Sequence, residues 1–128
     1  MSLNPESDLT ANTPVSLAAT PTVAAVATLL DPVAVHRALG DRTRYAVVRE
    51  LATGAALPVT ELARRLKRPR AVVSRHLAVL LAAGVVTVQQ DRQGDGRQRL
   101  YAIPAPCRRA PEAGQVLVDY GLCLVRFP

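Results

Sequence analysis

The sequence has little of what several classes of protein need. Its 128 residues include two cysteines, Cys107 and Cys123, and no Cys-x-x-Cys pair, which is too few for a disulfide framework. No stretch combines a charged start, an apolar core and a cleavage site in the way of a signal peptide. The apolar run from Ala18 to Leu30 is too short to span a bilayer. We therefore expect a cytoplasmic protein that makes no membrane contact.

The chain also lacks the residue patterns of an enzyme. Its two histidines, His36 and His76, form no His-Glu-x-x-His motif, and no Ser-His-Asp arrangement stands out. The glycines of 94–96 are typical of a hairpin turn and do not form a nucleotide-binding loop. His36 is expected at the surface, and His76 is expected to hydrogen-bond in the core or near bound nucleic acid. We expect no catalytic activity and no cofactor.

Positive charge, in contrast, is concentrated in the middle of the chain. Residues 1–35 contain no Lys or Arg, whereas residues 36–109 hold fifteen of the sixteen and only five of the ten acidic residues. Six cations and no acid lie between Arg64 and Arg75. Clustered basic charge of this kind favours a polyanionic partner, nucleic acid first of all.

Helix start and stop signals divide the basic region into four helices followed by a β-hairpin. Asp31 and Asp41 are N-cap residues, Pro58 and Pro69 open helices, and Gly84 ends the last one. We expect helices at 31–39, 41–54, 58–66 and 69–84, and strands at 85–88 and 98–103 around the glycine-rich turn 92–97. This order, α-α-α-α-β-β, is a winged helix-turn-helix, mainly α with a small β-hairpin.

Three segments follow from these patterns. Residues 1–30 lack periodicity and are expected to be largely disordered, and residues 31–103 form the predicted DNA-binding domain. Residues 104–128 form an apolar tail in which the stretch from Val116 to Phe127 is expected to be strand-like and to serve dimerisation or docking.

The fourth helix has the features of a DNA-reading helix. Its apolar stripe, Val73, Leu77 and Leu80, should face the core and turn the opposite side outward. Arginine is the usual partner of guanine in the major groove, and a small residue permits close approach to the bases. The predicted base-reading residues are Arg70, Ala71, Ser74 and Arg75.

Further polar and basic residues surround this helix. Contacts of such residues with phosphate position a protein on DNA without reading its sequence. The predicted phosphate contacts are Arg42, Thr43, Arg44, Arg64, Arg65, Lys67 and Arg68. A hairpin tip with arginine can enter the minor groove, and the predicted wing contacts are Arg92, Arg97 and Arg99.

Several motifs resemble those of the ArsR-type (ArsR/SmtB) family of bacterial regulators. They are ALGDRTRYAVVRELATG, ELARRL, VVSRHLAVLLAAGVVTV and, after the glycine-rich turn, RLYAI, and they extend over about 33–103. The resemblance implies a winged-helix homodimer that binds a palindromic operator in double-stranded DNA, usually as a repressor released by a metal, a metalloid or another signal. It also implies phosphate contacts for Arg42 and Arg44, base contacts for Arg70, Ser74 and Arg75, and a wing role for Arg97.

Departures from that family bear on metal binding. Members often carry a cysteine pair at the start of the third helix, where this chain reads Pro58 to Leu62 without Cys or His. Others bind zinc on a long C-terminal helix, but the chain after Ile103 is short and broken by proline. We therefore expect neither usual metal site. A dimer would use the first helix, the residues before it and the apolar tail.

Two alternatives use the same scaffold. Cys107 and Cys123 could form a redox or soft-metal sensor, with Arg108 and Arg109 lowering the pKa of Cys107. The chain could instead be a winged-helix protein-interaction module that docks through its tail by adding a strand to a sheet edge. The favoured prediction remains a homodimeric, DNA-binding repressor.

Overall fold

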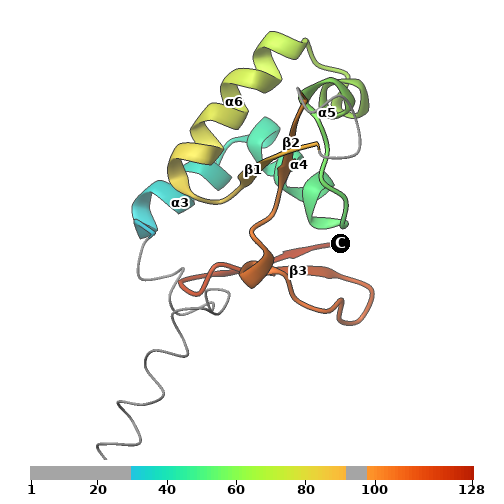
Figure 1. Cartoon of the computed structure of the whole chain (residues 1–128). Coiled ribbons are helices and arrows are strands. Elements are labelled where there is room, and N and C mark those ends of the chain that lie inside the picture. Colours follow the sequence, from blue (N-terminus) through green and yellow to red (C-terminus); the bar gives the residue numbers. More distant parts are fainter. Residues whose placement is uncertain (1–29, 92–97) are drawn as a thin grey trace, which may run out of the picture.

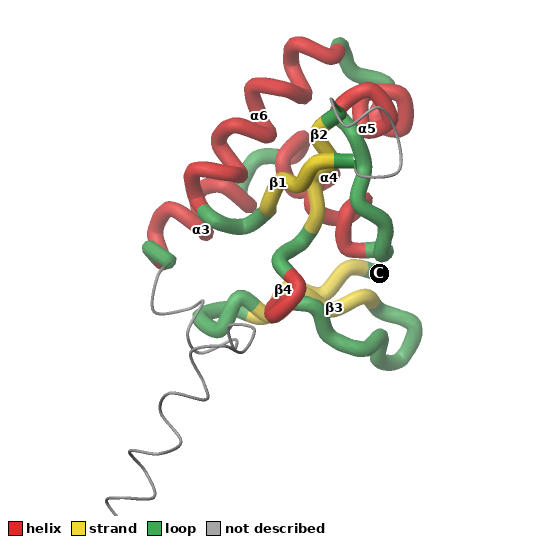
Figure 2. The backbone as a smooth tube through the Cα atoms, viewed as in Figure 1, coloured by secondary structure: helices red, strands yellow, loops and turns green. Residues whose placement is uncertain are grey.

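A computed structural model describes residues 30–91 and 98–128 (Figures 1 and 2). The helices are α3 (Pro32–Leu39), α4 (Arg42–Ala52), α5 (Val59–Leu66) and α6 (Arg70–Ala83). The strands are β1 (Thr87–Gln90), β2 (Arg99–Ala102), β3 (Val116–Asp119) and β4 (Leu124–Phe127), with a short 3-10 turn η1 (Ala105–Cys107) before β3. Disorder was expected for residues 1–30, of which residues 1–29 lie outside the described residues, as does the wing turn 92–97.

The four helices begin and end close to the predicted signals. The carboxylate of Asp31 accepts a hydrogen bond from Val33 N at 3.0 Å. The carboxylate of Asp41 accepts from Thr43 N at 2.8 Å and Arg44 N at 3.0 Å. These bonds satisfy backbone donors that have no partner inside a helix. Gly84 ends α6 in the left-handed conformation, with φ of 81°.

The first hairpin forms as expected, but its first strand starts two residues later in the sequence than predicted. We expected a strand at 85–88, whereas β1 pairs with β2 from Thr87↔Ala102 to Gln90↔Arg99. Val85 and Val86 precede the strand because both are buried in the core directly after α6. Leu57 extends the sheet from the α4–α5 connection through backbone hydrogen bonds of 2.9 and 2.8 Å with Tyr101.

The C-terminal tail, expected to be strand-like from Val116 to Phe127, is a second hairpin of two strands. β3 pairs with β4 from Val116↔Phe127 to Asp119↔Leu124. Gly121 turns the chain with φ of 86°, and its N–H donates to the Asp119 carboxylate at 2.8 Å. A positive φ of this size suits glycine because it has no Cβ.

One core joins the helices to this second hairpin. Phe127 is buried, and its ring centroid lies 5.0 Å from that of Tyr45 on α4. The buried Tyr120 donates a hydrogen bond of 2.9 Å to the carbonyl oxygen of Val85. Figure 1 shows the β3–β4 hairpin at the end of the molecule opposite the N-terminus of α6. The tail therefore closes the core without covering the predicted DNA-reading surface.

Candidate nucleic-acid interface

A tight turn links α5 to α6 and leaves the first turn of α6 uncapped. Lys67 takes the left-handed conformation with φ of 55°, and Arg68 N donates to Ala63 O at 3.1 Å. Pro69 precedes α6, and no side chain caps the N-terminus of that helix. The positive end of the helix dipole and its free N–H groups are thus open to an anion such as a phosphate.

The four predicted base-reading residues are all exposed in the first two turns of α6. Val73, Leu77 and Leu80 are at most 1% exposed and hold α6 against the core, which leaves Ala71, Ser74 and Arg75 outward, while Arg70 is exposed at the helix N-terminus. The helix thus presents two guanidinium groups, a hydroxyl and a small side chain together to a partner.

Other predicted phosphate contacts lie beside this helix. A small cleft of about 130 Å³ is lined by Arg42 and Thr43 of α4 and by Arg68 of the turn. The N-terminus of α4 therefore lies next to the α5–α6 turn. Within residues 30–91 and 98–128, the exposed side chains of Arg42, Lys67 and Arg68 make no ion pair, so they are available to a ligand.

Arg44 is used differently from Arg42, although both were predicted to contact phosphate. It is half-buried, and its Nε donates to Ala38 O at 2.8 Å while Nη2 donates to Arg37 O at 3.3 Å. These carbonyls belong to the C-terminal end of α3. Its Nη1 also lies 3.3 Å from His76 Nδ1 on α6. Arg44 therefore connects α3, α4 and α6 and helps to position α6.

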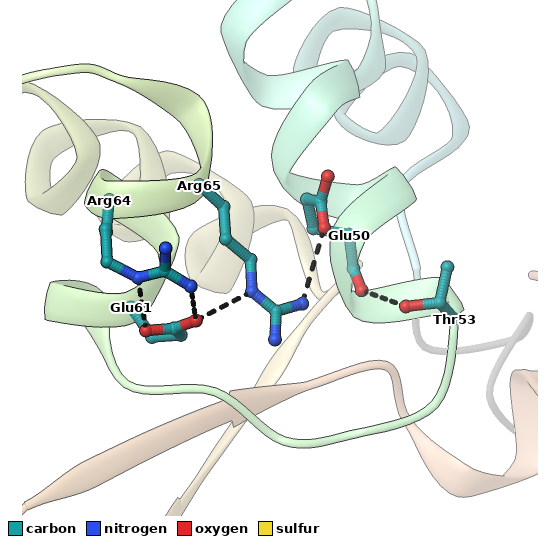
Figure 3. A network of polar contacts seen from close by, with 5 residues as sticks. All are labelled: Glu50, Thr53, Glu61, Arg64 and Arg65. Carbon is teal, nitrogen blue, oxygen red and sulfur yellow. Dashed lines mark hydrogen bonds and ion pairs between the residues drawn. The ribbon is translucent and has the colours of Figure 1, made fainter.

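Arg64 and Arg65 are not free cations, because two carboxylates pair with them (Figure 3). Glu61 accepts from Arg64 Nη2 at 2.5 Å and from Arg65 Nε at 2.9 Å, and Arg65 Nη1 lies 3.5 Å from Glu50. Hydrogen bonds from Arg64 and then Arg65 lower the pKa of Glu61 to about 2. The four side chains together carry no net charge. The spacing of Glu61 from Arg64 and Arg65, three and four residues, signals this pairing on a helix.

The predicted wing contacts are described only in part. Arg99 is exposed on β2, opposite Gln90 of β1. Arg92 and Arg97 fall in the turn outside the described residues. The two histidines lie as expected, His36 exposed on α3 and His76 half-buried beside Arg44, with its Nδ1 3.9 Å from Asp41 Oδ1.

The expected activation of Cys107 is wrong. Its side chain is fully buried under the C-terminal hairpin, and burial raises the pKa of the thiol to about 11, with Asp119 contributing in the same direction. The neighbouring Arg109 pairs with Asp119 and does not lower that pKa. Cys123 is half-buried rather than fully buried, and its pKa is also raised by burial. Burial therefore disfavours the reactive thiolate at both positions, and the half-buried Cys123 is the more accessible of the two.

Residues 30–91 and 98–128 contain no group of three or more His, Cys, Asp or Glu side chains placed to hold a metal ion. In the same part of the chain, no helix has the length and apolar character needed to cross a membrane.

Comparison with known proteins matches this geometry to a known fold. Residues 39–89 match the family described as "Helix-turn-helix domain". Solved structures with the same arrangement include reduced HlyU from Vibrio cholerae, 25% identical, with a TM-score of 0.50 over 57% of this chain and 72% of that one. The fold is a winged helix-turn-helix. Its four helices and following hairpin confirm the predicted fold class.

Two further relatives share part of the sequence. The HTH-type transcriptional regulator MJ1325 of Methanocaldococcus jannaschii is 32% identical over 57 residues, 44% of this chain. The chain spans 64% of the length of that relative. The cadmium sensor CMTR from Mycobacterium tuberculosis is 35% identical, with a TM-score of 0.47 over 56% of this chain and 70% of that one.

Proposed function

We propose that this protein is a DNA-binding transcriptional regulator that places α6 in the major groove of double-stranded DNA. The observation that carries the proposal is the exposed start of α6, where Arg70 and Arg75 flank Ala71 and Ser74 beside an uncapped helix N-terminus. Bidentate arginine contacts with guanine would read the sequence, while Ser74 would contact a base edge or a phosphate. Arg99 would contact the DNA from the wing.

Affinity comes from the phosphate contacts in this proposal. Arg42, Lys67 and Arg68 carry charges that no carboxylate of the described residues balances. Each phosphate contact releases counterions, so the affinity falls as the salt concentration rises. Arg44, Arg64 and Arg65 contribute less than their positions in the sequence suggest, because Arg44 is engaged inside the fold and Arg64 and Arg65 are paired with carboxylates. Thr43 lines the cleft beside Arg42 and Arg68 and would contact phosphate there.

The protein acts as a homodimeric repressor of the ArsR type in this proposal. Two copies of α6 about 34 Å apart would read a palindromic operator. The resemblance in sequence supports this assembly, as does Val33 of α3, an apolar side chain that is 58% exposed. The tail contributes less apolar surface than expected, because Val118, Tyr120 and Phe127 are buried in the protein's own core and Leu124 remains exposed.

The test is a DNA titration followed by fluorescence anisotropy. Labelled duplex from the region upstream of the gene is compared with a scrambled duplex, each at two salt concentrations. We expect tighter binding to the native duplex that persists at the higher salt. Equal binding of both duplexes, lost together as the salt rises, would contradict sequence-specific recognition.

Variants of α6 locate the reading surface. Arg70→Ala or Arg75→Ala should weaken specific binding by about 1–3 kcal/mol and relax the preference at one base pair in each half-site. Arg126→Ala is the matched control because it removes the same charge from an exposed residue of β4. The β3–β4 hairpin lies at the end of the molecule opposite the N-terminus of α6 (Figure 1). Equal losses in all three variants would contradict the assignment to α6. Sedimentation of Val33→Glu against the unaltered protein tests the dimer separately.

A further inference from the structure

A large cavity lies away from the DNA-reading face, at the base of the wing. Its volume is about 790 Å³, within the range of small-molecule sites. Most of its lining is apolar or small, and the small residues Gly54, Ala56, Ala102 and Ala105 leave the space open. The described residues that line it include no Asp or Glu.

Among the described residues that line this apolar space, Arg108 is the charged one. Arg108 follows η1, is half-buried, and is held by backbone pairing with Val118. Its side chain makes no hydrogen bond or ion pair within residues 30–91 and 98–128, whereas the neighbouring Arg109 pairs with Asp119. A guanidinium next to an apolar surface binds an anionic group strongly, because desolvation strengthens the charge-assisted hydrogen bond.

The cavity also touches the elements that orient the DNA-reading surface. Thr87 of β1 and Ala102 of β2 are paired residues at the base of the wing, and both line it. Gly84 ends α6, and Leu30 precedes α3 and covers Gly84 so closely that a Cβ there would lie 2.4 Å from Leu30 Cδ2. A molecule in the cavity would contact the wing, the end of α6 and the entry to α3 at once.

We propose that this cavity binds a small apolar carboxylic acid, with the acid's carboxylate paired to Arg108 and its apolar body packed against the base of the wing. The bound acid acts as an effector that alters how the wing and α6 meet DNA; this second part rests on the proposed function. The positive charge of Arg108 favours a carboxylate, and the apolar lining of the cavity favours an apolar body on the same molecule.

Calorimetric titration of the full chain without DNA tests the site, with decanoate as the probe and decanol as its uncharged counterpart. We expect saturable binding of decanoate and at least about tenfold weaker binding of decanol. Arg108→Gln should weaken decanoate binding by a similar factor and leave decanol binding unchanged. Arg126→Gln is the matched charge control and should bind decanoate normally.

A second variant fills the space without removing the charge. Ala105 is exposed at the cavity, so Ala105→Phe should fold normally, which circular dichroism checks, and should lose binding of both probes. Absence of saturable decanoate binding would overturn the proposal. Decanoate binding insensitive to both Arg108→Gln and Ala105→Phe would overturn it as well.

The DNA titration then tests the effector role. Saturating decanoate should change the affinity for the native duplex several-fold in the unaltered protein and not in Arg108→Gln. Decanoate binding without any change in DNA affinity would overturn the effector role. Failure to bind DNA at all would instead contradict the proposed function, and the titrations without DNA keep the two failures distinguishable.

Discussion

The hydroxyl of Tyr120 donates a hydrogen bond of 2.9 Å to the carbonyl oxygen of Val85, which joins the C-terminal hairpin to the residue that follows the end of α6. Both residues are fully buried. A carbonyl left without a donor in such a place loses its hydration without compensation. This single bond therefore connects the tail to the helix that carries the predicted base-reading residues.

Replacing Tyr120 with phenylalanine should lower the free energy of unfolding by about 1–2 kcal/mol, because the ring remains while the Val85 carbonyl loses its donor. Urea denaturation measures the change. Tyr45→Phe is the control, since the Tyr45 hydroxyl has no hydrogen bond within residues 30–91 and 98–128. An equal loss in both variants would indicate that the bond to Val85 contributes nothing.

Phe127→Ala should destabilise the protein more strongly, by about 3 kcal/mol, because it removes a buried ring and leaves a cavity against Tyr45. Leu124→Ala on the same strand, where the side chain is 47% exposed, should change stability by about 0.5 kcal/mol or less. Thermal and urea denaturation of both variants test whether the hairpin is part of the core. Similar small losses would mean that it is not.

Variants of Arg42 and Arg44 should distinguish an arginine that contacts phosphate from an arginine that stabilises the fold. Arg42→Gln should leave stability unchanged, weaken binding to all DNA sequences alike and reduce the salt slope by about one. Arg44→Gln should lower the free energy of unfolding by about 2 kcal/mol, because two carbonyls at the end of α3 lose a charged donor. Urea denaturation and DNA titration of both variants decide between the two roles.

Glu61→Gln should increase affinity for random DNA, because it releases Arg64 and Arg65 from their shared carboxylate. The expected change is a salt slope steeper by about one phosphate contact. The low pKa of Glu61, about 2, means that its ion pairs persist above the usual carboxyl pKa of 4.5 and are lost as the pH falls toward 2. Glu112→Gln, an exposed acid in the tail, is the matched control. Equal gains from both would show that only net charge matters.

Cys107 should resist alkylation by iodoacetamide in the folded protein, while the half-buried Cys123 reacts first. Burial raises the pKa of Cys107 from 9.0 to about 11, so its thiolate forms about two pH units later than in the unfolded chain. The folded state prefers the protonated thiol. The contribution of the protonated Cys107 thiol to the free energy of unfolding is therefore present below pH 9.0 and is lost as the pH rises toward 11.

Mass spectrometry of labelled peptides at increasing pH follows both thiols. Rapid labelling of Cys107 near neutral pH would contradict its burial and support the thiol-sensor hypothesis. The Cys123→Ser variant provides the control, because it leaves Cys107 as the only thiol in the chain.

The helices could be predicted because their signals are local. Asp31 and Asp41 cap the residues two and three positions later, and Gly84 takes the left-handed conformation that ends a helix. The side of α6 that faces solvent could be predicted in the same way, because burial of Val73 and Leu77 fixes the orientation of the helix. The fold class and the position of the predicted base-reading residues thus needed no long-range information.

The structure differs from the sequence-based predictions where residues far apart in the sequence make contact. Glu50 approaches Arg65 across two helices, and Arg44 reaches His76, thirty-two residues away. The paired strands of the tail depend on Gly121 and on the space that Phe127 fills beside Tyr45. Cys107 has basic sequence neighbours, but burial decides its pKa. Local patterns contain none of these tertiary contacts.

The core that supports the helix-turn-helix extends well beyond the segment that matches the domain family. That segment ends at residue 89, whereas Tyr120 and Phe127 complete the packing around Val85 and Tyr45. The helix-turn-helix segment is consequently not expected to fold as a separate unit. A chimaera that received residues 39–89 alone would expose apolar surface and aggregate, and a transplant must carry residues 30–128 to keep α6 in place.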